Sequence, residues 1–389
     1  MTKPFSTVLV GSGGFGATYV KKFLDNETDD FALMAIVDPF AANSSEFDRF
    51  NGVYPVYETL EEFFGTGAEA DFVIIATPIH LHYGQCITAL ENGAHVLCEK
   101  PIVPTIKELD ALEFKAKEAG KTLSVGFQSC YSEAILGLKT RIIKGDLGKP
   151  ISLKTAASWP REHAYYSRNS WAGKVKTDDG QTIYDSVISN ATSHYIHNML
   201  FLLGGDMESS AMLENAEVEV YRANDIESFD TCFLRGDAYG TSVYYATSHA
   251  TNHLYGPTSI YCFENATVLK SIFDQNHEIV IHYKNGKIEN LGGYSIYGSN
   301  EMMNKIAKSL NGLMPPVCTP HTVRPFTALV EAIFTQAPVN VFPNDYIVTN
   351  DKQTYVKHLH IDLMECFAGN KLPSELMKPW AKEPVRLNT

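Results

Sequence analysis

The sequence predicts an α/β protein with an N-terminal doubly wound parallel sheet and a C-terminal α/β domain built on a mainly antiparallel sheet. Up to about residue 127, short β-branched or apolar runs alternate with longer segments of helical period, the pattern of repeated βαβ units. From Ile151 onward, strand-like runs follow one another with Gly, Asn or Asp between them, which indicates antiparallel pairing. The 389 residues are enough for such a pair of domains, and we expect them to span residues 1–126 and 127–389.

Six parallel strands are expected in the first domain, of which the one near Val53 is the weakest. The other five are distinct apolar runs, at 7–10, 32–38, 72–76, 95–98 and 122–127. Helices are expected between them, over 14–25, 80–92 and 105–119. The last two are followed by Gly93 and Gly120, as is common where a helix ends.

The second domain is expected to begin with a helix over 132–143. Its strands are predicted at 216–221, 229–235, 241–249, 258–263, 266–273 and 278–283. Helices over 191–203 and 325–335 can cover one face of this sheet. We expect the other face to meet a partner subunit, in a homodimer or homotetramer. The region after Pro338 is too mixed to assign.

The charge balance excludes several classes of partner. With 45 acidic and 32 basic side chains, the formal net charge is −13, which repels nucleic acid and anionic lipid. No apolar run reaches the roughly 18 residues of a membrane span. The seven cysteines are odd in number and form no CxxC pair, which fits reduced thiols in a cytoplasm. We therefore expect a cytoplasmic protein with a small-molecule substrate, no nucleic acid partner and no membrane partner.

A glycine-rich turn directly follows the first strand. Residues 11–16 read GSGGFG, which matches G-x-G-x-x-G, and a helix follows. Gly11 permits the tight turn, Gly13 lets a pyrophosphate approach the backbone, and Gly16 lets the helix pack on the strand. This pattern predicts dinucleotide binding.

Asp38 ends the second strand, at the distance from this turn where a ribose-binding carboxylate is expected. A carboxylate accepts hydrogen bonds from ribose hydroxyls and repels a 2′-phosphate. The next residues, Pro39 and Phe40, supply no cation to offset that repulsion. The sequence therefore favours NAD over NADP as the cofactor.

Polar residues follow the next two strands at the sheet edge where ligands bind in doubly wound folds. Residues 76–83 read ATPIHLHY and residues 93–101 read GAHVLCEKP. This arrangement predicts that Lys100 lies beside the nicotinamide end of the cofactor, although a lysine after a strand is more often a solvated surface charge.

The whole set of motifs resembles the Gfo/Idh/MocA oxidoreductases over about residues 7–203. It comprises GSGGFG, VDP, ATPIHLHY, GAHVLCEKP, VGFQ and GDLGKP, in that order. The resemblance implies a Rossmann domain, a C-terminal domain with a large open sheet that often forms the oligomer interface, and contact of Lys100 with nicotinamide and the reacting hydroxyl. Cofactor contacts are expected from Gly11, Gly13, Gly14, Phe15, Gly16, Asp38, Thr77, Pro78, His82, Glu99, Lys100 and Gln128.

The family's second signature, an Asp followed four positions later by a His, corresponds here to Asn190 and His194. The resemblance implies that His194 is the catalytic histidine. The spacing of four residues places Asn190 on the same helical face, so we expect both residues to bind the substrate and act in catalysis. Alternatively, Asn190 is only a helix N-cap. The chain departs from the family where Asn190 replaces Asp, a loss that Asp185 could compensate. Cys130 stands where many relatives have Arg, which argues against assuming an anionic substrate.

A loop rich in aromatic and basic residues precedes this helix, at 159–173. Arg168 and Trp171 are its candidate substrate contacts, because apolar sugar faces stack on aromatic rings while guanidinium groups bind hydroxyls. The alternative is a packed loop anchored by Trp171.

These residues lead to the hypothesis of an NAD-dependent sugar dehydrogenase. Hydride would pass between a secondary hydroxyl of a sugar, cyclitol or sugar derivative and nicotinamide, while His194 takes the hydroxyl proton and Lys100 stabilises the oxygen. Two other classes stay open, a hydrolase or lyase that uses NAD transiently and a non-catalytic NAD-binding regulator.

No metal is expected, because the paired histidines lack a clear third ligand. These pairs are His80/His82, His194/His197 and His358/His360.

Overall fold

The structure, a computed structural model, describes residues 3–270, 278–293 and 300–389. The chain forms two compact units. Unit 1 comprises Met1–Tyr131 and Tyr297–Arg324, and unit 2 comprises Ser132–Ile296 and Pro325–Thr389. The return of Tyr297–Arg324 to unit 1 is not anticipated by the sequence, and the domain boundary after residue 126 stays a prediction. Among the described helices, none is long and apolar enough to cross a bilayer.

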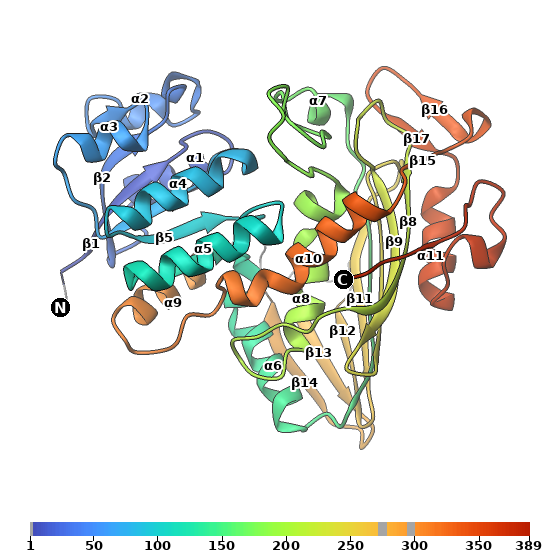
Figure 1. The fold of residues 1–389 in the computed structure, drawn as a ribbon. Coiled ribbons are helices and arrows are strands. Elements are labelled where there is room, and N and C mark those ends of the chain that lie inside the picture. The colour runs from blue at the N-terminus through green and yellow to red at the C-terminus, as the bar shows by residue number, and fades with distance from the viewer. Residues whose placement is uncertain (1–2, 271–277, 294–299) are drawn as a thin grey trace. The chain divides into compact units, whose positions relative to one another are not determined.

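Unit 1 is built on a six-stranded parallel sheet, as predicted (Figure 1). The strand order β3-β2-β1-β4-β5-β6 places β1 at the centre, where the winding direction reverses. The strands are β1 (Phe5–Val10), β2 (Phe31–Val37), β3 (Val56–Tyr57), β4 (Phe72–Ile75), β5 (His95–Glu99) and β6 (Leu123–Gly126). The weak strand lies a few residues after Val53, which itself belongs to a turn.

The helices of unit 1 agree with the capping signals in the sequence. The Thr105 side chain caps α5 by accepting from the backbone N–H of Glu108, and Gly120 ends that helix in the left-handed conformation. The helices are α1 (Gly16–Leu24), α2 (Phe47–Phe50), α3 (Leu60–Gly65), α4 (Ile79–Glu91), α5 (Ile106–Ala119), α9 (Asn300–Leu310) and the 3₁₀ turns η1 (Ala41–Asn43) and η2 (Gln128–Tyr131). The sequence did not predict α2, α3 or α9.

Unit 2 is built on a ten-stranded sheet that is mostly antiparallel, as predicted. Two pairs are parallel, β7 with β10 and β15 with β8. The path β14-β13-β12-β11-β7-β10-β9-β8-β15 is completed by β18, which pairs with β8. The strands are β7 (Pro150–Ser158), β8 (Glu214–Arg222), β9 (Thr231–Ala238), β10 (Thr241–Ser248), β11 (Tyr255–Phe263), β12 (Ala266–Lys270), β13 (Glu278–Tyr283), β14 (Ile288–Gly293), β15 (Asn340–Val341) and β18 (Val385–Arg386). Residues 271–273 of the strand predicted over 266–273 lie outside the described residues.

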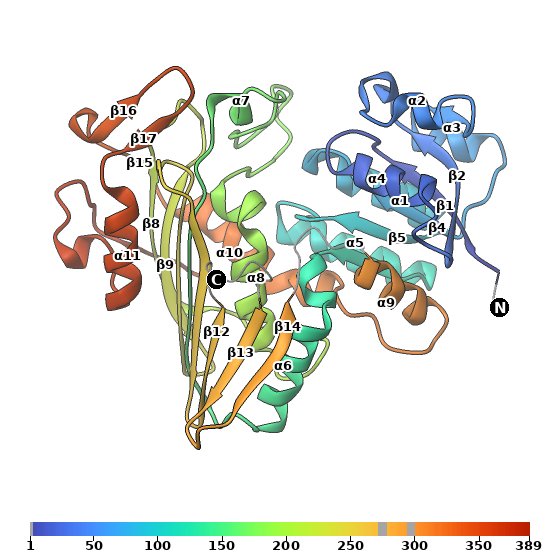
Figure 2. The same ribbon diagram turned by 180° about the vertical axis from the view of Figure 1, so that it is seen from behind.

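Helices cover both faces of this sheet at its centre, as Figures 1 and 2 show. Helix α8 packs on β7 from one side, where the Tyr245 hydroxyl donates to the Thr192 carbonyl. Helix α11 packs on β7 and β10 from the other side, and its Leu363 joins the core that contains Tyr244 and Ala246. The unassigned C-terminal region therefore supplies a covering helix. The expected partner-facing surface can only be the part of this face that α11 leaves uncovered.

The remaining elements of unit 2 complete these layers. Helix α6 (Glu133–Lys144) is capped by Ser132 and Gly145 and packs against α8 and β14. The others are α7 (His163–Tyr166), η3 (Val187–Ala191), α8 (Ser193–Leu202), η4 (Asn344–Tyr346), β16 (Ile347–Thr349), β17 (Thr354–Val356), α11 (Leu359–Gly369) and η5 (Ser374–Leu376). Helix α10 (Pro320–Gln336) begins in unit 1 and continues into unit 2 at Pro325.

Candidate functional site

The glycine turn joins β1 to α1 with geometry that only glycine permits at two positions. Gly11 has φ +88°, and a Cβ there would lie 2.8 Å from the Ala76 carbonyl oxygen. A Cβ on Gly16 would lie 2.1 Å from the Gly11 carbonyl oxygen, so any side chain would push α1 off β1. By contrast, a Cβ on Gly13 or Gly14 meets no atom within 4 Å. The middle of the turn therefore presents bare backbone to open space.

Asp38 is fastened to this turn by its own side chain. Its Oδ2 accepts hydrogen bonds from the Ser12 backbone N–H (2.8 Å) and the Ser12 hydroxyl (2.7 Å). Its Oδ1 accepts from the Phe40 N–H (2.8 Å). Since each carboxylate oxygen has two lone pairs, Oδ1 keeps capacity for a further donor such as a ribose hydroxyl. The carboxylate is thereby held in a fixed orientation beside the turn.

Lys100 directly follows β5 and is positioned by a buried carboxylate. Glu99 Oε1 accepts from the Tyr19 hydroxyl on α1 (2.6 Å) and from Gln128 Nε2 on η2 (2.9 Å), and Oε2 accepts from the Lys100 N–H (3.2 Å). Burial raises the pKa of the Glu99 carboxyl, and these hydrogen bonds oppose the rise. A side chain on Gly126 would come within 2.8 Å of this carboxyl. Glu99 and Gln128, predicted as cofactor contacts, are thus buried residues that link α1, β5 and η2.

The other predicted cofactor residues follow β4 and begin α4. The buried His82 ring lies between two loops, with Nε2 2.8 Å from the Thr77 carbonyl oxygen and Nδ1 3.0 Å from that of Pro101. Burial lowers the pKa of His82. The Thr77 hydroxyl donates to Gln85 Oε1 (2.6 Å), Pro78 is the N-cap of α4, and Phe15 is the N-cap of α1. His82 therefore acts within unit 1 as a brace between the loops that follow β4 and β5.

In unit 2, Asn190 and His194 do not share one regular helix. Residues Val187–Ala191 form a π-helical turn, and α8 starts only at Ser193. The N-cap of the π turn is Ser186, and that of α8 is Thr192, so the alternative that Asn190 is a helix N-cap is wrong. Because Asn190 lies in the π turn and His194 in α8, the two residues do not lie one turn apart on a single α-helix, so the expected shared face of a regular helix is not formed. Such turns are frequent at functional sites.

Asp185 points toward Asn190, a relation that the sequence left open. Its Oδ1 accepts from Asn190 Nδ2 (2.8 Å), and its Oδ2 accepts from the Gly173 N–H (2.6 Å). Asp185 is buried, as is His194, whose side chain is 3% exposed. A buried carboxylate five residues earlier in the chain thus contacts Asn190 directly.

The loop over 159–173 brings both predicted substrate residues together. The Arg168 guanidinium carbon lies 3.8 Å from the centre of the Tyr165 ring and 5.1 Å from that of Trp171. One face of each ring is thereby covered by a cation. Arg161 of the same loop lies over the Tyr165 ring at 4.7 Å. The sequence missed one neighbour, His249, which directly follows β10. His249 was hidden because it comes from a strand about 80 residues away along the chain.

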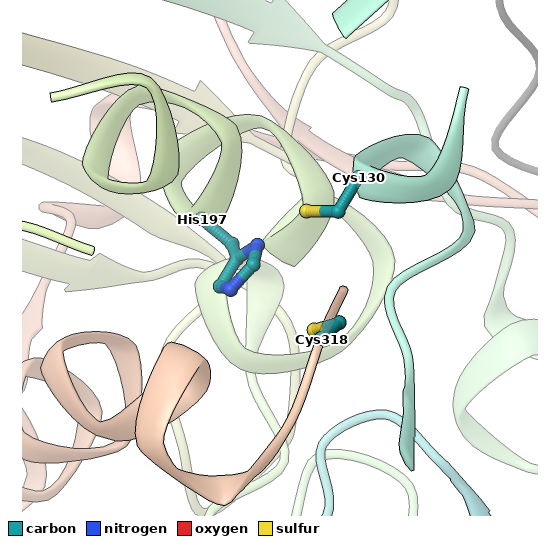
Figure 3. A group of neighbouring side chains, drawn as sticks. All are labelled: Cys130, His197 and Cys318. Atoms are coloured by element: carbon teal, nitrogen blue, oxygen red, sulfur yellow. The ribbon is translucent and has the colours of Figure 1, made fainter. Parts of the chain in front are cut away.

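Figure 3 labels three buried side chains, of which Cys130 and Cys318 belong to unit 1 and His197 to α8 of unit 2. The two sulfur atoms lie within 4.8 Å of each other. At the position where the resemblance led us to look for an arginine, unit 1 thus has a buried thiol packed beside another thiol.

Comparison with known proteins independently supports a dinucleotide-binding fold for the N-terminal part of the chain. Residues 5–127 match the model of the Gfo/Idh/MocA oxidoreductases, described as an oxidoreductase family with an NAD-binding Rossmann fold. The chain is 31% identical over 150 residues to scyllo-inositol 2-dehydrogenase (NAD(+)) of Bacillus subtilis, which is 38% of this chain and 42% of that protein. It is 28% identical over 215 residues to inositol 2-dehydrogenase of Streptomyces avermitilis, 55% of this chain and 57% of that protein. The chain thus spans about half the length of the curated relatives it matches.

The same fold occurs in solved structures. The WlbA dehydrogenase of Bordetella pertussis, crystallised with NADH and UDP-GlcNAcA, superposes with a TM-score of 0.68 at 21% identity, covering 85% of this chain and 95% of that one. At this identity the likeness concerns the fold of the chain. With the match over residues 5–127 and the glycine turn of unit 1, the N-terminal part of the chain is similar to the NAD-binding Rossmann fold of the Gfo/Idh/MocA oxidoreductases.

Proposed function

We propose that the protein is an NAD-dependent dehydrogenase that transfers hydride between a secondary hydroxyl of a sugar, cyclitol or sugar derivative and nicotinamide. The observation that carries the proposal is the glycine turn with Asp38 fastened to it, at the strand ends of the sheet that also bears Lys100. The inositol dehydrogenases among the relatives support the substrate class.

The residues of unit 1 fit a dinucleotide. The bare backbone of Gly13 and Gly14 leaves room for a pyrophosphate at the N-terminus of α1, and the free lone pair of Asp38 suits a ribose hydroxyl. We assign NAD binding to these residues, with Phe15, Thr77 and Pro78 beside them. When bound, NAD supplies a hydride acceptor at its nicotinamide ring.

The chain's own residues then handle the proton and the charge. In the direction of oxidation, the carbinol C–H bond gives up hydrogen with its electron pair, the O–H proton goes to His194, and a carbonyl forms. Lys100 stabilises the negative charge that develops on oxygen, and Asn190, oriented by Asp185, donates a hydrogen bond to the substrate. In the reverse direction His194 returns the proton.

A spectrophotometric screen of NADH formation over inositols, aldoses and sugar acids tests this function. We expect at least one compound to give NADH in stoichiometric amount, with NAD⁺ preferred to NADP⁺ because Asp38 repels a 2′-phosphate. Asp38→Ala should reduce that preference at least tenfold. NAD binding without NADH formation across the whole panel would refute the dehydrogenase, and product formation with only catalytic NAD would identify a lyase or hydrolase instead.

The proposal also covers the cellular compartment of the protein and its oligomeric state. We place the protein in the cytoplasm, which is supported by seven cysteines that form no disulfide among the described residues. We further propose a homodimer or homotetramer formed through the uncovered part of the sheet of unit 2. The net charge of −13 supports the absence of nucleic acid partners.

A further inference from the structure

Two guanidinium groups of unit 2 converge on one aromatic ring. The Cζ atoms of Arg161 and Arg168 lie 4.7 and 3.8 Å from the centre of the Tyr165 ring. Arg161 also lies over Trp159 (5.6 Å), and Arg168 over Trp171 (5.1 Å). A guanidinium that lies over an aromatic ring is restricted in its motion. Its N–H groups, which lie in the plane of the guanidinium, can still donate hydrogen bonds to a ligand. We call Arg161, Arg168, Tyr165 and His249 the arginine cluster.

Neither arginine of the cluster is neutralised by a carboxylate within the described parts of the chain. Arg168 donates to the Tyr165 carbonyl oxygen, and the Nε of Arg161 is buried without a hydrogen-bond partner among those residues. Four of the other six arginines of the chain have carboxylate partners, namely Arg49, Arg141, Arg235 and Arg324. Two neighbouring cations that form no direct ion pair with a described residue can stabilise an oxyanion by charge-assisted hydrogen bonds of about 2.8 Å.

His249 adds a buried acceptor to the cluster. Its ring lies 5.7 Å from that of Tyr165, and its side chain is 2% exposed. Nδ1 donates to the Trp159 carbonyl oxygen (2.8 Å), so in the neutral ring Nε2 carries the lone pair. Burial and then the charge of Arg161 lower the pKa of His249 to about 3, so the ring is neutral at physiological pH. Nε2 has no hydrogen-bond partner among the described residues. It can accept a hydrogen bond from a ligand hydroxyl.

The cluster is tied to the segment that carries the proposed catalytic histidine. The Trp159 ring packs edge-on against Tyr195, the residue after His194 on α8 (5.6 Å). At the other end of the loop, the Gly173 N–H donates to Asp185, which also holds Asn190. Within unit 2, the arginine cluster and the Asn190–His194 segment are thus held together by direct contacts.

We infer that the arginine cluster binds an anionic group of the substrate. The substrate is then a hydroxylated acid, such as a sugar acid, or a sugar phosphate. One oxyanion is held by Arg161 and Arg168, while a nearby hydroxyl donates to His249 Nε2. This inference rests on the proposed function and narrows its substrate class. It also departs from the expectation drawn from Cys130, because two cations that can bind an anion lie within unit 2.

Matched substrate pairs test the inference in the NADH assay. D-Glucuronate and D-gluconate are compared with D-glucose and myo-inositol, and D-glucose 6-phosphate separates phosphate from carboxylate as the recognised group. We expect a sugar acid or sugar phosphate to be the best substrate. Arg168→Gln and Arg161→Gln should each raise its KM about 10- to 100-fold with kcat less affected, and Arg168→Lys should recover part of the loss.

Arg386→Gln is the matched control, because Arg386 lies in the same unit and donates to Asn215 instead. Its KM should equal that of the unaltered protein. Neutral substrates preferred over acids, or arginine variants with unchanged KM for the acid, would overturn the inference.

A binding measurement separates failure of this inference from failure of the proposed function. Calorimetric titration with D-glucuronate and with D-glucose 6-phosphate needs no turnover. If no compound yields NADH but one of these anions binds and Arg168→Gln abolishes the binding, the dehydrogenase fails while the anion site stands. If neutral sugars are oxidised and neither anion binds, the dehydrogenase stands and the anion site is refuted.

Discussion

At the scale of single residues, His194 has the most specific predicted role. General base catalysis is typically worth about 10²–10⁴ in rate, so His194→Ala should lower kcat by that order. NAD affinity should not change, because the glycine turn and Asp38 belong to unit 1. Steady-state kinetics and calorimetric titration with NAD⁺ measure the two quantities. His282→Ala, which removes an exposed histidine of β13, is the control. A His194→Ala variant with full kcat would remove this residue from the mechanism.

His249 makes the stability of unit 2 dependent on pH. Its folded-state pKa of about 3 lies below the unfolded value of about 6.5. As pH falls through this window, the unfolded chain takes up a proton that the folded chain does not. The free energy of unfolding should therefore fall by about 2–3 kcal/mol between pH 7 and 4.5, and be unaffected by this group above pH 7.

Urea titrations can isolate the contribution of His249, since all three tryptophans, Trp159, Trp171 and Trp380, lie in unit 2 and report its unfolding by fluorescence. His249→Leu should lose this part of the pH dependence, even if its stability at pH 7 also changes. An equal slope in both proteins would contradict the assigned pKa.

At the scale of elements, the same substitution at two glycines of one turn should impair different properties, stability in one case and NAD binding in the other. Gly16→Ala forces a Cβ against the Gly11 carbonyl oxygen, so it should lower the melting temperature of unit 1 and cost about 1–3 kcal/mol. Gly13→Ala meets no protein atom, so the fold should keep its stability while NAD affinity falls at least tenfold. Circular dichroism melting and calorimetric titration distinguish the two effects. Equal NAD affinity in Gly13→Ala would exclude that glycine as a phosphate-binding position.

The elements also mark how far the sequence alone could predict the fold and the site. Five of the six strands of unit 1 were predictable because each is an apolar run bounded by turn residues and helix caps, whereas β3 has only two residues and was placed a few residues too early. Helix α11 was not predictable, because its apolar residues show which side of the helix is buried only once the helix packs on β7 and β10. At the candidate site, Asn190 and His194 were predicted from the resemblance to the family's signature, whereas the contact between Asp185 and Asn190 involves a π turn that no spacing rule anticipates. His249 required the sheet register.

At the scale of the whole molecule, the proposed assembly depends on the sheet face that α11 leaves uncovered. Along each strand, every second side chain points to this face and the others are buried on the opposite face. The pairing of β11, β12 and β13 places Ile260, Leu269 and Val280 next to one another. Leu269 is 37% exposed, whereas its neighbour Val268, on the opposite face, is buried. An apolar row across neighbouring strands on a half-exposed face is suited to pairing with a second copy.

Leu269→Asp should therefore convert the protein to a monomer. A carboxylate in the centre of an apolar interface loses its hydration without gaining a partner, and two-fold symmetry places the same charge on both subunits. Size-exclusion chromatography with light scattering at several concentrations gives the mass of each species relative to the 43.2 kDa chain. Val341→Asp, at an exposed apolar position on β15 near the other edge of the sheet, is the control and should leave the oligomer intact. A monomeric unaltered protein, or an oligomer that persists in Leu269→Asp with its fold retained, would refute assembly through this face.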